Sequence, residues 1–113
     1  MHELSLMEGM LDVIEEQARE GGFDRVHVIV LEVGKLAGVE VAALRFAFDV
    51  VTKGTRAEGA RLELQEPVGM GWCEACRQEV EVEARYEPCP LCLKGPLRLT
   101  DGTQVRVMSL EVA

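Results

Sequence analysis

All four cysteines of the chain lie between residues 73 and 92, where they form two CxxC pairs. Cys73 and Cys76 make the first pair, twelve residues follow, and Cys89 and Cys92 make the second. A structural zinc site needs four thiolates about 2.3 Å from one ion, and each CxxC turn can present two of them. The same cysteines could form two disulfides, but the chain shows no secretion signal and the spacing is that of a metal site. The sequence therefore predicts one zinc ion bound by all four cysteines.

The predicted zinc site has no open coordination position, because four thiolates complete its tetrahedron. A catalytic zinc keeps one position for water or substrate, so this site is predicted to be structural. In so small a module, metal binding would supply most of the folding free energy. Nucleic-acid binding, which many zinc ribbons perform, is disfavoured here. Five glutamates lie between the outer cysteines with only Arg77 and Arg85, and the whole chain carries a net charge of −8, whereas phosphates must be met by Lys and Arg.

A second candidate metal site lies at the N-terminus, at one of the chain's two histidines. His2 follows Met1, which should be retained because N-terminal processing removes Met only before small residues. The α-amine, the His2 imidazole and nearby backbone nitrogens could converge on one ion, and such a planar nitrogen set suits Ni(II) or Cu(II). A merely solvated His2 is the alternative. His27 stands in an apolar run and is predicted to be an ordinary strand histidine with a hydrogen-bond partner.

The element that must position His2 is an amphipathic helix predicted over residues 4–20. Its apolar residues recur every three or four positions, as one face of a helix requires. Ser5 and Glu8 form a candidate capping box, and with Ser5 as N-cap residues 1–4 would lie outside the helix. A start one turn earlier is the alternative. Gly21 and Gly22 should end the helix. The apolar face comprises Leu4, Met7, Leu11, Ile14 and Ala18.

The remaining elements predict an α+β fold, with two helices packed on a three-stranded sheet. The continuous apolar run at 26–33 is typical of a central strand covered on both faces. A second helix is expected at 39–53, and strands at 61–66 and 104–112. Because a lone strand at the C-terminus would be unstable, it should return to this sheet. Residues 1–68 and 97–113 would then form an α/β domain. Residues 69–96, with a short strand at 80–84, would form an inserted four-cysteine zinc-ribbon module.

Several specific motifs occur in this order: Met1-His2-Glu3, Gly38-Val39-Glu40, the segments at 43–48 and 57–62, and the paired CxxC motifs. Together they resemble the HypA/HybF family of hydrogenase nickel-insertion proteins. The resemblance covers essentially the whole chain. It implies a nickel metallochaperone for maturation of [NiFe] hydrogenase and, in some organisms, of urease.

The same resemblance implies the metal ligands and partners. Transported Ni(II) would bind at Met1, His2 and Glu3 through the amine, the imidazole and backbone nitrogens that include that of Glu3. Zinc would be structural in the four-cysteine module. The implied partners are a HypB-type GTPase and the hydrogenase large-subunit precursor. Some family members carry a histidine beside the cysteine motif, whereas this chain has Leu93-Lys94 there, which calls into question any zinc-to-nickel signalling through that residue.

The sequence favours a carrier over an enzyme. It offers no His/Glu metal triad, no Gly-rich phosphate loop and no Ser/His/Asp set, so any nucleotide-driven step would come from a partner. No apolar run approaches the roughly 18–20 residues that span a membrane, and reduced cysteines suit a cytoplasmic protein. The alternatives are a zinc-ribbon module that binds protein or nucleic acid, and a metal-dependent enzyme. A homodimer is left open.

Overall fold

The first helix begins at His2. In the computed structural model, which describes residues 2–113, α1 runs His2–Gly21 and buries one apolar face. Gly22 has a φ of 71°, and its N–H donates to the carbonyl oxygen of Ala18 at 2.8 Å, which ends the helix as predicted. The predicted Ser5 cap is wrong, because His2 and Glu3 already belong to the helix. The buried face comprises Met7, Met10, Ile14 and Ala18.

A contact distant in the sequence explains the early start of α1. The Glu3 carboxylate Oε2 accepts a hydrogen bond from the backbone N–H of Glu40 at 3.2 Å. Glu40 is the N-cap residue of α2 (Val41–Val51) and has no side-chain cap of its own. The first turn of α1 is thus anchored at the start of α2, and the two helices pack against each other. This tertiary contact outweighs the local Ser5–Glu8 capping signal.

Helix α2 is shorter than the predicted 39–53, and Thr52 follows its last residue as the C-cap. Its buried residues are Leu44, Ala47 and Phe48. The Thr52 hydroxyl and the Thr52 N–H both donate to the carbonyl oxygen of Phe48, at 2.7 and 3.1 Å. These bonds satisfy a carbonyl group that the helix end would otherwise leave without a partner.

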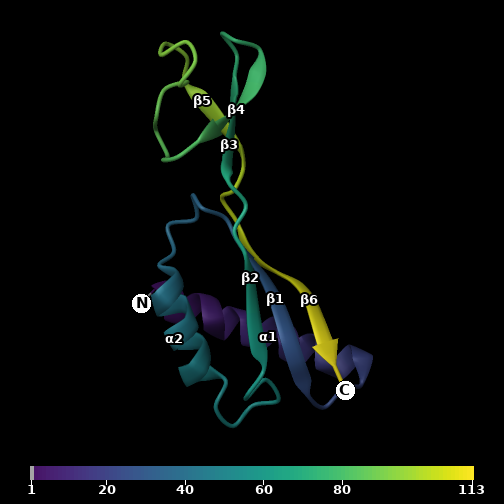
Figure 1. Ribbon diagram of the computed structural model, residues 1–113. Helices are drawn as coiled ribbons and strands as arrows, with labels where there is room; N and C mark the ends of the chain where they lie inside the picture. Colours follow the sequence, from purple (N-terminus) through teal and green to yellow (C-terminus); the bar gives the residue numbers. More distant parts are fainter. Residues whose placement is uncertain (1) are drawn as a thin grey trace. The chain divides into compact units, whose positions relative to one another are not determined.

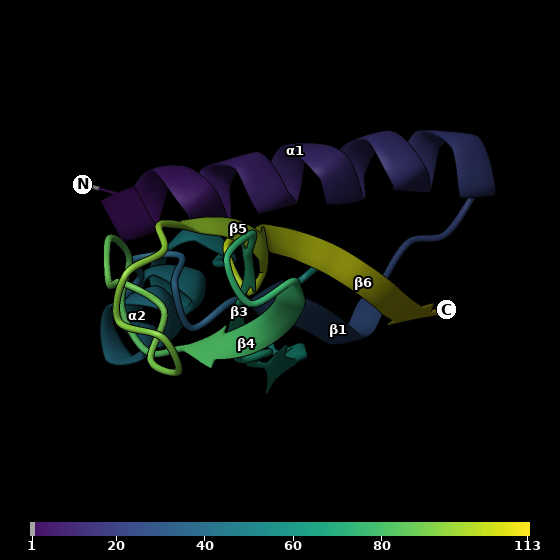
Figure 2. The ribbon, with the colours of Figure 1, turned by 90° about the horizontal axis from the view of Figure 1, so that it is seen from above.

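The two helices pack on a three-stranded sheet in the order β2-β1-β6. Strand β1 (Val26–Val33) lies in the centre, β2 (Arg61–Gln65) on one side and β6 (Val105–Val112) on the other. The C-terminal strand therefore returns to the sheet, as predicted. Figure 1 shows α2 beside β2, and Figure 2 shows α1 running along one face of the sheet. His27 is the exposed position in the first half of β1.

A second three-stranded sheet has the order β4-β3-β5. Strand β3 (Gly69–Cys73) pairs antiparallel with β4 (Gln78–Val82) and with β5 (Leu97–Asp101). Only β4 was predicted, as residues 80–84. Two glycines in β3 conceal its strand character in the sequence, yet packing requires one of them. A Cβ on Gly69 would lie 2.6 Å from the carbonyl oxygen of Val82.

The chain groups into two compact units. The first comprises Met1–Leu31, Val39–Leu64 and Arg106–Ala113, and the second comprises Glu32–Gly38 and Gln65–Val105. The predicted module of residues 69–96 lies within the second unit, which also takes in the segment 32–38. Within residues 2–113, no helix combines the length and the apolar character needed to cross a membrane.

Candidate metal centre

The two CxxC pairs fold into two turns with the same backbone pattern. The N–H of Arg77 donates to the carbonyl oxygen of Cys73 at 2.7 Å, and the N–H of Leu93 donates to that of Cys89 at 2.8 Å. Both donors follow the second cysteine of their pair and both adopt left-handed backbone, with φ of 55° and 60°. Each turn is therefore closed by a residue in a conformation that only glycine adopts without cost.

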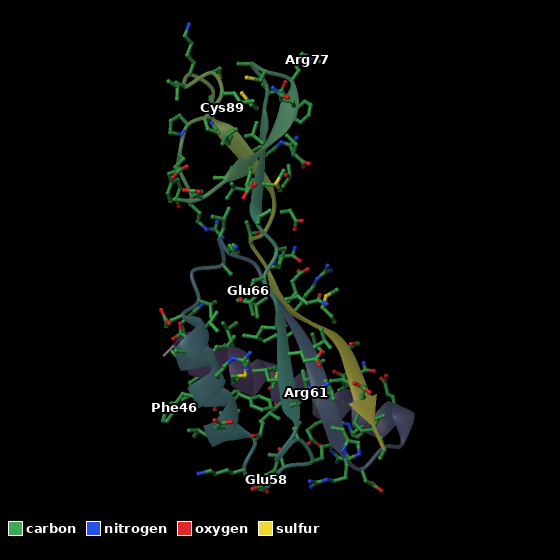
Figure 3. All side chains as sticks on the ribbon, in the orientation of Figure 1. Phe46, Glu58, Arg61, Glu66, Arg77 and Cys89 are labelled. Carbon is green, nitrogen blue, oxygen red and sulfur yellow. The ribbon has the colours of Figure 1, made fainter. Side chains whose placement is uncertain are left out.

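The turns bring four sulfur atoms within 4.8 Å of one another. The Cys73 and Cys92 sulfurs are 3.8 Å apart, and so are those of Cys76 and Cys89. A tetrahedron with metal–sulfur bonds of about 2.3 Å has edges of about 3.8 Å. A disulfide would place two sulfurs only about 2.05 Å apart, and all four thiols are free. The predicted cysteine cluster is present, and its size fits one tetrahedral metal ion; Figure 3 shows sulfur atoms gathered beside Cys89.

Backbone N–H groups favour the thiolate form of one cysteine. Hydrogen bonds from the N–H groups of Lys94 and Gly95 lower the pKa of Cys92 to about 6. The pKa of the Cys76 thiol is raised to about 12, mainly by a hydrogen bond shared with Cys92 and to a smaller extent by burial. The thiolate is the form that binds metal. Cys92 therefore offers the cluster a ready ligand near neutral pH, and the same N–H groups can stabilise its negative charge when a metal is bound.

Gly95 lies directly against the sulfur cluster. Its carbonyl oxygen accepts a hydrogen bond from the N–H of Cys89 at 3.1 Å. A Cβ at this position would lie only 2.8 Å from the Cys73 sulfur and 3.7 Å from the Cys92 sulfur. The sequence analysis did not single out this glycine, and its position three residues after Cys92 is the signal that could have found it.

A small apolar core packs against the cysteine cluster and includes two of its cysteines. Cys73 and Cys89 are buried in it together with Leu36, Val80 and Val82. Leu36 comes from the segment between β1 and α2, and its N–H donates to the carbonyl oxygen of Gly102 at 2.8 Å. Its own carbonyl oxygen accepts from Nε of Arg85 at 2.8 Å. The metal centre thus rests on two separate segments of the chain.

The residues of the predicted N-terminal site lie in the first turn of α1. Met1 lies outside the described residues. His2 is exposed and Glu3 is half-buried. The backbone N–H groups of Glu40 and of Glu3 itself hold the pKa of the Glu3 carboxyl below its usual value. Among residues 2–113, the four cysteines are the one group in which three or more metal-ligating side chains converge.

Three comparisons with known proteins agree with one another. Residues 1–112 match the family described as hydrogenase/urease nickel incorporation, metallochaperone, hypA. The hydrogenase maturation factor HypA of Cereibacter sphaeroides is 50% identical over 112 residues, and that of Azotobacter chroococcum mcd 1 is 48% identical; both alignments cover 99% of each chain. The solution structure of the Ni metallochaperone HypA from Helicobacter pylori has a TM-score of 0.72 at 20% identity, over 97% of this chain and 96% of that one. At that identity, the likeness to the solved structure establishes the fold.

Proposed function

This chain belongs to the HypA family of hydrogenase/urease nickel-incorporation metallochaperones, and on that premise we propose that it binds Ni(II) at its N-terminus and delivers it to a [NiFe] hydrogenase during maturation. Urease is the second candidate acceptor. The proposed ligands are the Met1 amine, the His2 imidazole and the backbone nitrogens of His2 and Glu3. Four nitrogens in a plane suit Ni(II) and disfavour Mg(II) or Ca(II), which prefer oxygen.

The start of α1 at His2 is the observation that carries the nickel proposal. The first N–H groups of a helix have no acceptor within the helix. The amide protons of His2 and Glu3 can therefore be displaced by a metal without breaking any hydrogen bond of the helical ladder. Backbone amides deeper in α1 could not bind a metal in this way, because each donates a hydrogen bond to the carbonyl oxygen four residues earlier.

The helix end also favours release of the metal. The N-terminus of a helix carries a partial positive charge, which works against a bound cation by up to about 1 kcal/mol. Two negative contributions offset this repulsion. One is the charge left on the amide nitrogens when they lose their protons, and the other is the nearby Glu3 carboxylate. A carrier needs such a balance, because it must hold Ni(II) until an acceptor offers better ligands.

We further propose that the cysteine cluster holds a structural zinc ion. The thiolate donor set and the sulfur spacing of 3.8 Å both suit tetrahedral Zn(II). With all four positions filled by cysteine, the ion supplies folding free energy and offers no site for substrate. The chain acts as a carrier, without catalytic residues of its own.

A HypB-type GTPase and the hydrogenase large-subunit precursor are the proposed partners. The large-subunit precursor is the protein that would accept the nickel. The GTPase would supply any nucleotide-driven step, because this sequence offers no phosphate-binding loop. A cytoplasmic site of action fits the free thiols.

Calorimetric titration of the untagged, zinc-loaded chain with Ni(II) tests the nickel site. His2→Ala should abolish specific nickel binding and leave zinc content and helicity unchanged. His27→Ala is the matched control, since it removes the other exposed histidine and should keep nickel affinity. Extra residues before Met1 should weaken binding, because they convert the amine into an amide. Undiminished nickel affinity in His2→Ala would reject the proposed site.

A further inference from the structure

The four cysteines differ in how easily a small oxidant can reach them. Cys73 and Cys89 are fully buried, whereas Cys76 and Cys92 are half-buried. Each CxxC turn therefore has one shielded sulfur and one sulfur that solvent can reach. A dissolved peroxide oxidises only a thiolate that it can approach. The candidates for a first attack are thus Cys76 and Cys92, the second cysteine of each pair.

Backbone hydrogen bonds distinguish these two accessible sulfurs. The N–H groups of Lys94 and Gly95 donate to the Cys92 sulfur. Within residues 2–113, by contrast, the Cys76 sulfur shares hydrogen bonds only with the other three cysteines. When all four sulfurs are metal-bound thiolates, an N–H donor withdraws electron density from its sulfur and makes that sulfur a weaker nucleophile. Cys76 is therefore the more reactive of the two accessible sulfurs.

A partner for a disulfide lies close to the Cys76 sulfur. Cys89 Sγ is 3.8 Å away, and it belongs to the other CxxC turn. A disulfide bond of about 2.05 Å would require the two sulfurs to approach by about 1.8 Å. Because Cys89 is buried, it is shielded from peroxide and suited to react second. Redox-sensing cysteines are often placed next to such a resolving cysteine.

We propose that the cysteine cluster is a peroxide-sensitive redox switch, in which Cys76 is oxidised first and Cys89 then forms a disulfide with it across the two turns. The Cys76 thiolate attacks one oxygen of hydrogen peroxide, the O–O bond breaks, and a sulfenic acid and a hydroxide ion form. The Cys89 thiolate then attacks the Cys76 sulfur, the S–O bond breaks, and a second hydroxide leaves. The two thiolates together lose two electrons, which the peroxide takes up.

The disulfide would remove two of the four proposed zinc ligands at once. Cys73 and Cys92 alone cannot complete a tetrahedron, so zinc should be released and the second unit should lose the folding free energy that the ion supplies. Reduction by a dithiol would restore both thiolates and the site. The inference goes beyond nickel delivery, and it rests on the proposed zinc ion.

The test treats the full, untagged, zinc-loaded chain with an equimolar amount of hydrogen peroxide. A chromophoric chelator reports zinc release, and mass spectrometry after alkylation of the remaining thiols identifies the first disulfide. We expect zinc release together with a Cys76–Cys89 disulfide, with Cys73 and Cys92 still alkylated. Zinc binding should return after reduction with a dithiol.

Cys89→Ser and Cys73→Ser form a matched pair of variants, because each removes one buried thiolate. Cys89→Ser should slow disulfide formation at Cys76 by at least about tenfold and let dimedone trap the sulfenic acid there, with at least about tenfold more adduct on Cys76 than on Cys92. Cys73→Ser should still form the Cys76–Cys89 disulfide. The disulfide found in the wild-type chain tests the inference even if both variants lose zinc.

Several results would overturn the redox inference. They are a first disulfide within one CxxC pair, a first disulfide between Cys73 and Cys92, and oxidation to sulfinic acid without any disulfide. Zinc that stays bound while the thiols remain unreacted would also overturn it. Failure of the zinc proposal appears independently, as the absence of zinc from the chain before peroxide is added.

Discussion

Replacing Gly95 by alanine should damage the metal centre through a single methyl group. The added Cβ would lie 2.8 Å from the Cys73 sulfur, whereas non-bonded atoms rest about 3.5–4.0 Å apart. The sulfur would have to move by about 0.7 Å, well beyond the roughly 0.2 Å that metal–ligand distances tolerate. Gly95 is not among the residues with positive φ, so alanine fits its backbone and the steric effect on the sulfur alone is tested.

The expected loss in zinc affinity is about 10- to 100-fold, as for other residues that orient metal ligands. Competition with a chromophoric zinc chelator measures it on the full chain. Substitution of the zinc by Co(II) adds a second readout, because distortion of the tetrahedron should shift the visible absorption bands.

Gly9→Ala is the matched control for Gly95→Ala. Gly9 lies within α1, and a Cβ there would meet no atom within 4 Å. Its zinc affinity and Co(II) spectrum should equal those of the wild type, while helix stability rises by about 0.5–1 kcal/mol. If Gly95→Ala also binds zinc with wild-type affinity and gives an unchanged Co(II) spectrum, the reasoning from the close approach of Gly95 to the sulfur is refuted.

Two further predictions concern the second unit. Leu93→Gly should make the zinc-loaded unit more resistant to chelator and heat, because a left-handed non-glycine residue costs about 1–2 kcal/mol and the Leu93 side chain is largely exposed; a more labile site would contradict this. Zinc removal should alter the fluorescence of Trp72, the chain's one tryptophan, which lies in β3, before the circular dichroism of α1 and α2 is lost. Simultaneous loss of both signals on chelation would show that the first unit also depends on the metal.

The first sheet could be predicted because its strongest signals are local. The β-branched run at 26–33 has no polar face to present to water over most of its length, so it had to lie in the centre of a sheet. The strand at 104–112 alternates but cannot stand alone, and only the strands at 26–33 and 61–66 were available to pair with it. The cysteine cluster was equally visible, because CxxC spacing alone places two sulfurs on one turn.

What the sequence could not predict depends on contacts between distant residues. The start of α1 is set by Glu3 and Glu40, which are 37 residues apart, so a search for caps within α1 selected Ser5 instead. Strand β3 was hidden because its glycines look like a loop. A Cβ on Gly69 would lie 2.4 Å from Cδ1 of Leu36 and 2.6 Å from the carbonyl oxygen of Val82, so this position has room only for glycine. No pattern in residues 69–73 reveals a partner from the segment 32–38.

Glu3 shows how one residue can serve both the fold and the proposed site. Its side chain, for which the sequence predicted no role, accepts a hydrogen bond from the N–H of Glu40 at 3.2 Å. Its backbone nitrogen lies in the first turn of α1 and makes no hydrogen bond of the helical ladder, and its N–H interacts with the residue's own carboxylate. In the proposed nickel site, the anchored side chain would hold this nitrogen and that of His2 in a fixed relation, which lowers the entropy cost of closing the ligand set around the metal. In that proposed site, the Glu3 side chain would fix the ligands through its hydrogen bond to Glu40, and the exposed His2 would be the ligand that an incoming partner replaces first.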